Sequence, residues 1–146
     1  MLIALIGESC AGKSTLAEHL AAALGAETVT GKDYLRLAKS ESLARALFCK
    51  KLKEAVPGGN LIYVISEPEH LKLLPEGTVK ILVHADLETI MTRFRARMRG
   101  NLPAPVEQML ERRHGCFDGG DYDYRYDGVN GDPEALCKTL IRRAQA

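Results

Sequence analysis

Hydrophobic residues along the chain fall into two alternating patterns: short unbroken runs, and longer stretches in which they recur every three or four positions. An unbroken run of about five apolar residues is typical of a strand buried on both faces of a parallel sheet. The runs are Leu2–Ile6, Leu61–Ile65 and Val79–Val83, and Glu27–Thr30 is predicted as a further short strand. Because helical stretches alternate with these strands, the pattern predicts a three-layer α/β/α fold with a mostly parallel sheet of about five strands.

Capping residues set the expected limits of the helices. The segments with helical spacing are 14–24, 33–56, 86–98, 106–116 and a last helix that opens at Asp132-Pro133-Glu134. Gly25 is expected to end the first helix, the second is expected to break near Ser40 and to stop before Pro57, and Asp86 is a predicted N-cap. Residues 100–105 are predicted as a loop.

Residues 121–127 depart from the continuous apolar runs. Tyr122, Tyr124 and Tyr126 alternate with charged residues there. Strict alternation leaves one face of a strand in water, so we expect an edge strand of the same sheet.

Composition narrows the class of protein. A chain of 146 residues with 46% hydrophobic and 27% charged residues suits one soluble globular domain. Its formal net charge of +1 indicates no general attraction to nucleic acid or membrane. The apolar start is too short to span a bilayer and lacks the features of a signal peptide, so a cytoplasmic location is expected. The four cysteines form no C-x-x-C pair and are expected to be free thiols.

Residues Gly7–Ser14 match the phosphate-loop pattern G-x-x-x-x-G-K-[ST] in full. The buried strand and the helix that this pattern requires stand on either side of it. Glycines let such a loop curl so that its N–H groups point inward, and the helix N-terminus adds positive charge. We predict that Lys13 reaches the β- and γ-phosphates and that Ser14 holds Mg²⁺. The predicted nucleotide-binding residues here are Gly7, Cys10, Ala11, Gly12, Lys13, Ser14 and Thr15, with only packing assigned to the Cys10 side chain.

The loop leaves the reaction open, but other features restrict it. GTP-binding switch proteins carry an Asn-Lys-x-Asp motif, which none of the asparagines here supplies, and large motor-like ATPases are longer. Small kinases that move the γ-phosphoryl group of ATP to a small acceptor are the class that is left.

Arginines gather where such a kinase needs them. Six of the eleven lie between residues 93 and 113, where no lysine occurs. The planar guanidinium suits the spread charge of a transferring phosphoryl group. Arg93 and Arg97 share one helix face, as do Arg95 and Arg99, so one pair is expected to face the site and the other to face solvent. A solvated helix face is the alternative for any single arginine.

Magnesium in this class needs an acid near the end of a neighbouring strand. Glu67 follows the apolar run 61–65 and is the first candidate, and Asp33 after the second strand is its rival. A surface loop acid is the alternative for Glu67.

The order of these features resembles that of nucleoside monophosphate kinases, most closely the guanylate kinase family. The resemblance covers about residues 1–25 and 61–140, and its later part consists of Val79–His84, Arg93, Arg97, Arg112, Arg113, Tyr122-Asp123-Tyr124 and Val129-Asn130. It implies catalytic contacts to phosphates from Arg97, Arg112 and Arg113 besides Lys13. It also implies that Asn130 and Gly131 border the adenine of ATP.

An acceptor-binding segment is expected over residues 31–59. The stretch Thr30-Gly31-Lys32-Asp33-Tyr34-Leu35-Arg36 is similar to the Thr-Gly-Asp-x-x-Arg acceptor segment of adenylate kinases, with one extra residue before the arginine. The predicted substrate-binding residues are Thr30, Asp33, Arg36, Glu67 and Arg93. The strand-rich acceptor insertion of guanylate kinases is missing, and the predicted lid, 99–105, is as short as in compact kinases of shikimate or gluconate.

We therefore expect one phosphate-loop kinase domain over residues 1–146 that uses ATP and Mg²⁺. The main hypothesis is transfer to a nucleoside monophosphate. One alternative is a kinase of a small non-nucleotide metabolite, and another is a catalytically weak nucleotide-binding or scaffold module. The expected partner is a small-molecule acceptor, with no nucleic acid and no membrane, and the oligomeric state is left open.

Overall fold

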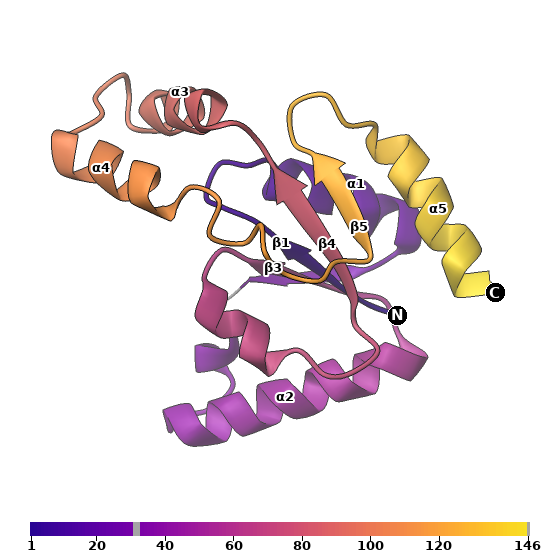
Figure 1. Ribbon diagram of the computed structural model, residues 1–146. Coiled ribbons are helices and arrows are strands. Elements are labelled where there is room, and N and C mark those ends of the chain that lie inside the picture. Colours follow the sequence, from indigo (N-terminus) through magenta and orange to yellow (C-terminus); the bar gives the residue numbers. More distant parts are fainter. Residues whose placement is uncertain (31–32, 146) are drawn as a thin grey trace.

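A single parallel sheet organises the chain (Figure 1). The computed structural model describes residues 1–30 and 33–145, so Gly31 and Lys32 of the predicted acceptor segment lie outside the described residues. The strands are β1 (Leu2–Ile6), β2 (Glu27–Thr30), β3 (Leu61–Ile65), β4 (Val79–His84) and β5 (Tyr124–Asp127). They pair in the order β2-β3-β1-β4-β5, and every pairing is parallel. This confirms the predicted sheet and places residues 124–127 at its edge.

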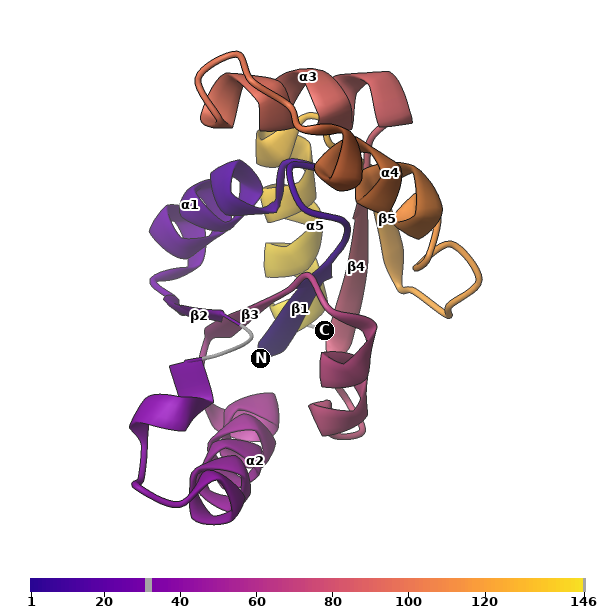
Figure 2. The same ribbon diagram turned by 90° about the vertical axis from the view of Figure 1, so that its left-hand side faces the viewer.

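Helices cover both faces of this sheet and one end of it. They are α1 (Lys13–Leu24), α2 (Glu41–Gly58), α3 (Leu87–Arg97), α4 (Ala104–Arg113) and α5 (Pro133–Gln145), with short 3-10 helices η1 (Asp33–Arg36) and η2 (Pro68–Leu73). Figure 1 shows α1 and α5 on one face and α2 with η2 on the other. Figure 2 shows α3 and α4 together above the connection from β1 to α1. The predicted three-layer α/β/α fold is confirmed.

The two faces of β1 belong to two separate parts of the core. Ile3 and Leu5 pack in the cluster that includes α1 and α5, whereas Leu2, Ala4 and Ile6 pack in the cluster that includes α2. Because successive side chains of a strand point to opposite faces, a strand between two helical layers must be apolar throughout. All five residues of β1 are buried, as are all five of β3.

The predicted N-cap of α3 is present, since Asp86 Oδ1 accepts a hydrogen bond from Thr89 N at 3.1 Å. Ser40, where a break was expected, caps α2, and its Oγ accepts a hydrogen bond from Leu43 N at 3.4 Å. Three boundaries were wrong, one of them the end of α4, which lies at Arg113 and not at residue 116. Helix α2 continues through Pro57, because a proline in the last turn costs only one backbone hydrogen bond, and α4 begins at Ala104, because a proline also fits the first turn of a helix.

The edge strand is shorter than its alternating pattern suggested. It begins at Tyr124, because the Asp123 carboxylate accepts a hydrogen bond from Lys80 N at 2.8 Å and takes up a donor of the neighbouring strand. Within the described residues, no helix has both the length and the apolar character needed to cross a bilayer.

Candidate active site

The phosphate loop lies at the carboxyl end of the central strand β1, where it leads into α1. Its backbone turns sharply, since Cys10 and Gly12 both adopt positive φ, 65° and 113°. A side chain at Gly12 would also come within 3.2 Å of the Gly128 carbonyl oxygen. Glycine is therefore required at this position for both conformation and space. The result is a curled loop at the start of a twelve-residue helix, which is a ready site for an anion.

Lys13 is the buried cation of this loop. Its side chain is 5% exposed, and Nζ donates hydrogen bonds to the Gly7 and Glu8 carbonyl oxygens at 2.7 and 2.6 Å. Burial is the main cause that lowers the pKa of Lys13 to about 8. An ammonium group that has lost most of its water interacts strongly with a phosphate placed beside it.

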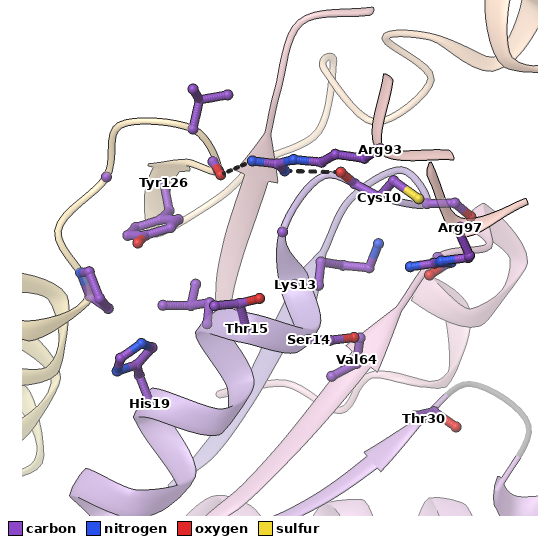
Figure 3. A pocket seen from close by; sticks show the side chains of 18 of the residues that line it. Cys10, Lys13, Ser14, Thr15, His19, Thr30, Val64, Arg93, Arg97 and Tyr126 are labelled. Carbon is purple, nitrogen blue, oxygen red and sulfur yellow. Dashed lines mark hydrogen bonds between the residues drawn. The ribbon is translucent and has the colours of Figure 1, made fainter. Parts of the chain in front are cut away.

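A cavity of about 730 Å³ opens along this loop. Figure 3 shows the Lys13 side chain between two ends of the cavity, with Tyr126 and His19 at one end and Arg97 and Thr30 at the other. We call these the Tyr126 end and the Thr30 end. The Tyr126 end also includes Gly128, Val129, Gly131 and Pro133, whereas the Thr30 end includes Val64 and the residues that follow β3, namely Ser66, Glu67 and His70. Two ends that meet at Lys13 suit a phosphoryl donor and an acceptor.

Arg93 holds the Tyr126 end to the phosphate loop. Its guanidinium donates to Cys10 O at 3.1 Å and to Gly128 O at 2.9 Å (Figure 3). A Cβ atom on Gly128 would overlap Ala11 O, so the turn after β5 packs directly on the loop. The sequence hypothesis counted Arg93 among the acceptor contacts. In the structure its guanidinium bonds the phosphate loop and the turn after β5, so it joins three separate segments of the chain.

The arginine pairs of α3 point as their spacing predicted. Arg93 and Arg97 line the cavity, whereas Arg95 and Arg99 lie outside its described wall. Arg93 is half-buried, and the other three are exposed. Figure 3 shows the Arg97 guanidinium reaching toward the Lys13 side chain. Lys13 of α1 and Arg97 of α3 therefore face the same part of the cavity, as transfer of a phosphoryl group requires.

The segment at the end of α4 is tied to two neighbouring segments. Arg113 donates to the Glu67 carboxylate at 2.7 Å, and the hydrogen bond with that carboxylate raises the pKa of Arg113. One oxygen of Glu8 lies 3.1 Å from His114 Nδ1, and its other oxygen accepts a bond from Gly115 N at 3.3 Å. Glu67, the first candidate for supporting magnesium, is thus paired with an arginine.

Other predicted site residues lie outside the described wall of the cavity. They are Gly7, Ala11, Asp33, Arg36, Arg112, Arg113 and Asn130. The Asp33 carboxylate accepts a hydrogen bond from Thr30 N at 2.7 Å, so it acts on a residue that does line the cavity. Arg36, Arg112 and Asn130 are exposed.

Sequence reasoning missed several residues of the cavity. Ser66 and His70 follow β3, and Tyr126, Gly128 and Pro133 belong to the end of β5 and the segment after it. A signal was available, because the carboxyl ends of parallel strands meet at one edge of a sheet and ligands bind there. The rule that points to Glu67 applies equally to Ser66 and His70, which follow the same strand.

The lowered pKa of Lys13 predicts how nucleotide binding depends on pH. Above pH 8 the free chain loses the Lys13 proton that a phosphate needs, while the charge of ADP is constant because its last phosphate pKa is about 6. The dissociation constant for ADP is therefore expected to rise by up to about tenfold per pH unit between pH 8 and 10. Calorimetric titration measures it. A flat profile over this range would contradict the assigned pKa.

Comparison with known proteins agrees with this geometry. No family model matches the chain. The shikimate kinase of Desulforudis audaxviator is 32% identical over 143 residues, which covers 82% of this chain and 75% of that protein. Among solved structures, the shikimate kinase of Aquifex aeolicus has 19% identity and a TM-score of 0.58, covering 99% of this chain and 96% of its own. A gluconokinase from Sinorhizobium meliloti has 15% identity and a TM-score of 0.60, covering 97% and 95%.

The parallel sheet, the complete phosphate loop and these relatives define the chain as an ATP-dependent kinase of a small molecule. Within that class, the chain belongs to the shikimate kinase family. The expected membership of the guanylate kinase family is not supported, and the alternative of a kinase for a non-nucleotide metabolite is favoured. The misleading signals were an edge strand with alternating tyrosines and a helix with arginines, which are local features that a three-layer kinase fold can carry with different acceptors.

Proposed function

We propose that the chain transfers the γ-phosphoryl group of MgATP to a hydroxyl group of a small hydroxylated carboxylic acid, with shikimate as the first candidate. The observation that carries this proposal is the relative named shikimate kinase, which is 32% identical to this chain. The Thr30 end of the cavity supports it, because it combines the hydroxyl groups of Thr30 and Ser66 with the cation of Arg97. Such groups suit the hydroxyls and the carboxylate of an acid.

The phosphate loop fits MgATP. MgATP supplies the phosphoryl group, and the chain contributes a curled backbone, the start of α1 and the buried ammonium of Lys13. Ser14 in the first turn of α1 lines the cavity, and its hydroxyl is the proposed protein ligand of magnesium. Glu67, whose Oε2 is paired with Arg113, would support the magnesium ion through its carboxylate. The backbone at Tyr126–Gly131 and Pro133 forms the proposed nucleotide end.

Arginines on α3 and α4 are the proposed clamps of the reacting groups. Arg97 faces Lys13 and is placed to neutralise charge on the transferring phosphoryl group. Arg113 is held by Glu67 beside the Thr30 end and is the proposed partner of an anionic group at the acceptor. Arg112 and Asn130 stay predicted contacts to phosphate and adenine, and Asp33 and Arg36 stay predicted acceptor residues.

An ADP-release assay with a panel of acceptors tests the proposal. Shikimate, gluconate, AMP and GMP are compared at saturating MgATP, because they differ in ring, carboxylate and base. Turnover with shikimate at least about tenfold above every other compound is the expected result, since a site that hydrogen-bonds particular hydroxyls discriminates strongly against analogues that lack them. The Lys13→Met variant serves as the inactive control. Preferential turnover of AMP or GMP would overturn the proposal and support the nucleoside monophosphate hypothesis instead.

A further inference from the structure

The Thr30 end of the cavity contains one buried polar side chain that the proposed function does not use. His70 in η2 lines the cavity and is 8% exposed. Its Nδ1 atom is closed off from solvent and has no hydrogen-bond partner among the described residues. Among the described residues, no other buried side-chain nitrogen or oxygen atom lacks a hydrogen-bond partner. A buried polar atom without a partner costs about 1–3 kcal/mol, so its presence calls for an explanation.

Aromatic packing fixes the place of the His70 ring. The ring lies edge-on to Tyr34, with centroids 6.4 Å apart and planes at 83°. Tyr34 stacks on Phe48 at 5.5 Å, and Phe48 meets Tyr63 edge-on at 5.0 Å. This row of rings runs from Tyr34 in η1 across α2 to strand β3. The imidazole therefore cannot easily leave the cavity wall.

A half-turn of the imidazole about its Cβ–Cγ bond exchanges Nδ1 with Cδ2 and Nε2 with Cε1, and the ring keeps its volume and its plane. Packing against Tyr34 therefore permits either orientation. A ligand beside the ring is able to give a nitrogen the partner that the protein does not supply.

The neighbours of His70 already have partners of their own. Glu67 is paired with Arg113, and Thr30 N is bonded to Asp33. A hydroxyl group is the ligand group that suits the imidazole best, because a hydroxyl both donates and accepts and so satisfies a neutral imidazole in either tautomer.

We propose that His70 is a specificity-determining residue whose imidazole forms a hydrogen bond with a hydroxyl group of the acceptor. This inference rests on the proposed function, since it deepens the assignment of the Thr30 end as the acceptor site. It assigns the acceptor to molecules that carry a hydroxyl group besides the one that is phosphorylated. Replacing that hydroxyl by hydrogen is expected to weaken binding of the acceptor to the natural chain, and not to a variant that lacks the imidazole.

Three variants test the role of His70. His70→Phe keeps an aromatic ring against Tyr34 and removes both nitrogens, and we expect the KM for the acceptor to rise about tenfold or more while the KM for ATP is unchanged. His70→Asn places a polar atom near the position of Nδ1 and is expected to restore part of the loss. His84→Phe makes the same change on an exposed side chain of β4 and is the matched control. The melting temperature of His70→Phe should not fall, because the unpartnered nitrogen is gone.

Acceptor analogues separate a direct hydrogen bond from a structural role. Deoxy analogues of the acceptor, each lacking one hydroxyl, are assayed with the natural chain and with His70→Phe. One analogue is expected to lose about tenfold in kcat/KM with the natural chain and to lose little with the variant. An equal loss with both proteins for every analogue would overturn the inference, as would an unchanged acceptor KM in His70→Phe.

The failure of this inference differs from failure of the proposed function. If the natural chain phosphorylates a nucleotide from the panel and not an acid, the proposed function is wrong, and the same variants are then compared on that nucleotide. A second measurement detects binding where no turnover occurs. The protein is titrated with shikimate in the presence of MgADP, and the ¹⁵N resonances of the His70 imidazole are recorded, with those of His84 as internal reference. Shifts at His70 support the hydrogen bond, and their absence at saturation overturns it.

Discussion

Lys13→Met is expected to abolish phosphoryl transfer and, at the same time, to make the folded chain more stable. Methionine keeps the length and packing of the lysine side chain and removes its charge. The Lys13 side chain lies between the two ends of the cavity, so its loss removes a preorganised charge from the place proposed for the transferring group. We expect kcat to fall by on the order of 10²-fold or more. Steady-state ADP release measures this change, and unchanged turnover would show that Lys13 is not at the reaction centre.

The expected gain in stability follows from the burial of the same ammonium. The pKa of Lys13 falls from 10.5 to about 8 on folding, which corresponds to a cost of about 3 kcal/mol at pH 7. Two carbonyl oxygens lose a donor in the variant, so we expect a net gain in the free energy of unfolding of about 1–3 kcal/mol.

The pH dependence of this gain has a defined sign. Below pH 8 the lysine is charged in both the folded and the unfolded chain, and the whole cost is present. Between pH 8 and 10.5 the folded chain loses the proton first, so the natural chain becomes more stable and the advantage of Lys13→Met shrinks. Urea unfolding at pH 7 and pH 10 measures both values. A variant that is less stable than the natural chain at pH 7 would contradict the assigned cost of burial.

Arg97→Ala is expected to slow the chemical step far more than it weakens nucleotide binding. The guanidinium faces Lys13 across the cavity, where charge spreads over the phosphoryl oxygens in the transition state. A group that acts mainly in the transition state lowers kcat when it is removed and leaves ground-state binding nearly unchanged. We expect kcat to fall by about 10²-fold and the dissociation constant for ADP to change by less than about threefold.

Arg95→Ala is the matched control for this variant. Arg95 lies on the same helix two residues away, is exposed and does not line the described wall of the cavity. Arg97 is exposed too but lines the cavity, so the two variants differ in their place relative to the site. Removal of Arg95 is expected to change kcat by less than about twofold, because an exposed charge away from the site contributes little and is screened by salt. Both variants are compared at low and moderate ionic strength. Equal effects of the two would show that α3 carries only a solvated charged face and would favour a nucleotide-binding module.

The fold was predictable because its signals are local. A strand buried on two faces must be apolar along its whole length, and Leu2–Ile6 and Leu61–Ile65 show this directly. The phosphate loop is equally local, since eight consecutive residues form the turn, the helix start and the cation. Asp86 also marked its helix correctly, because a capping side chain bonds a backbone group three residues away.

The nature of the acceptor could not be derived in the same way. The Thr30 end of the cavity is built from residues at the end of β2, at and after the end of β3, and on α3. These are far apart in the sequence and meet only because the carboxyl ends of parallel strands share one edge. The resemblance to guanylate kinases rested on the order of local features in the second half of the chain. That order carries no information about which side chains share the acceptor space.

The sequence by itself determined the layers, the strands of the sheet and the phosphate loop, because each depends on contiguous residues and their period. Tertiary structure alone decided how single side chains are used. Arg93 bonds two backbone carbonyls, one in the phosphate loop and one in the turn after β5. Glu67 is paired with Arg113, and the ring of His70 is held against Tyr34 with a nitrogen that has no partner among the described residues. Each of these depends on a contact between segments more than thirty residues apart. Patterns over neighbouring residues do not predict such contacts.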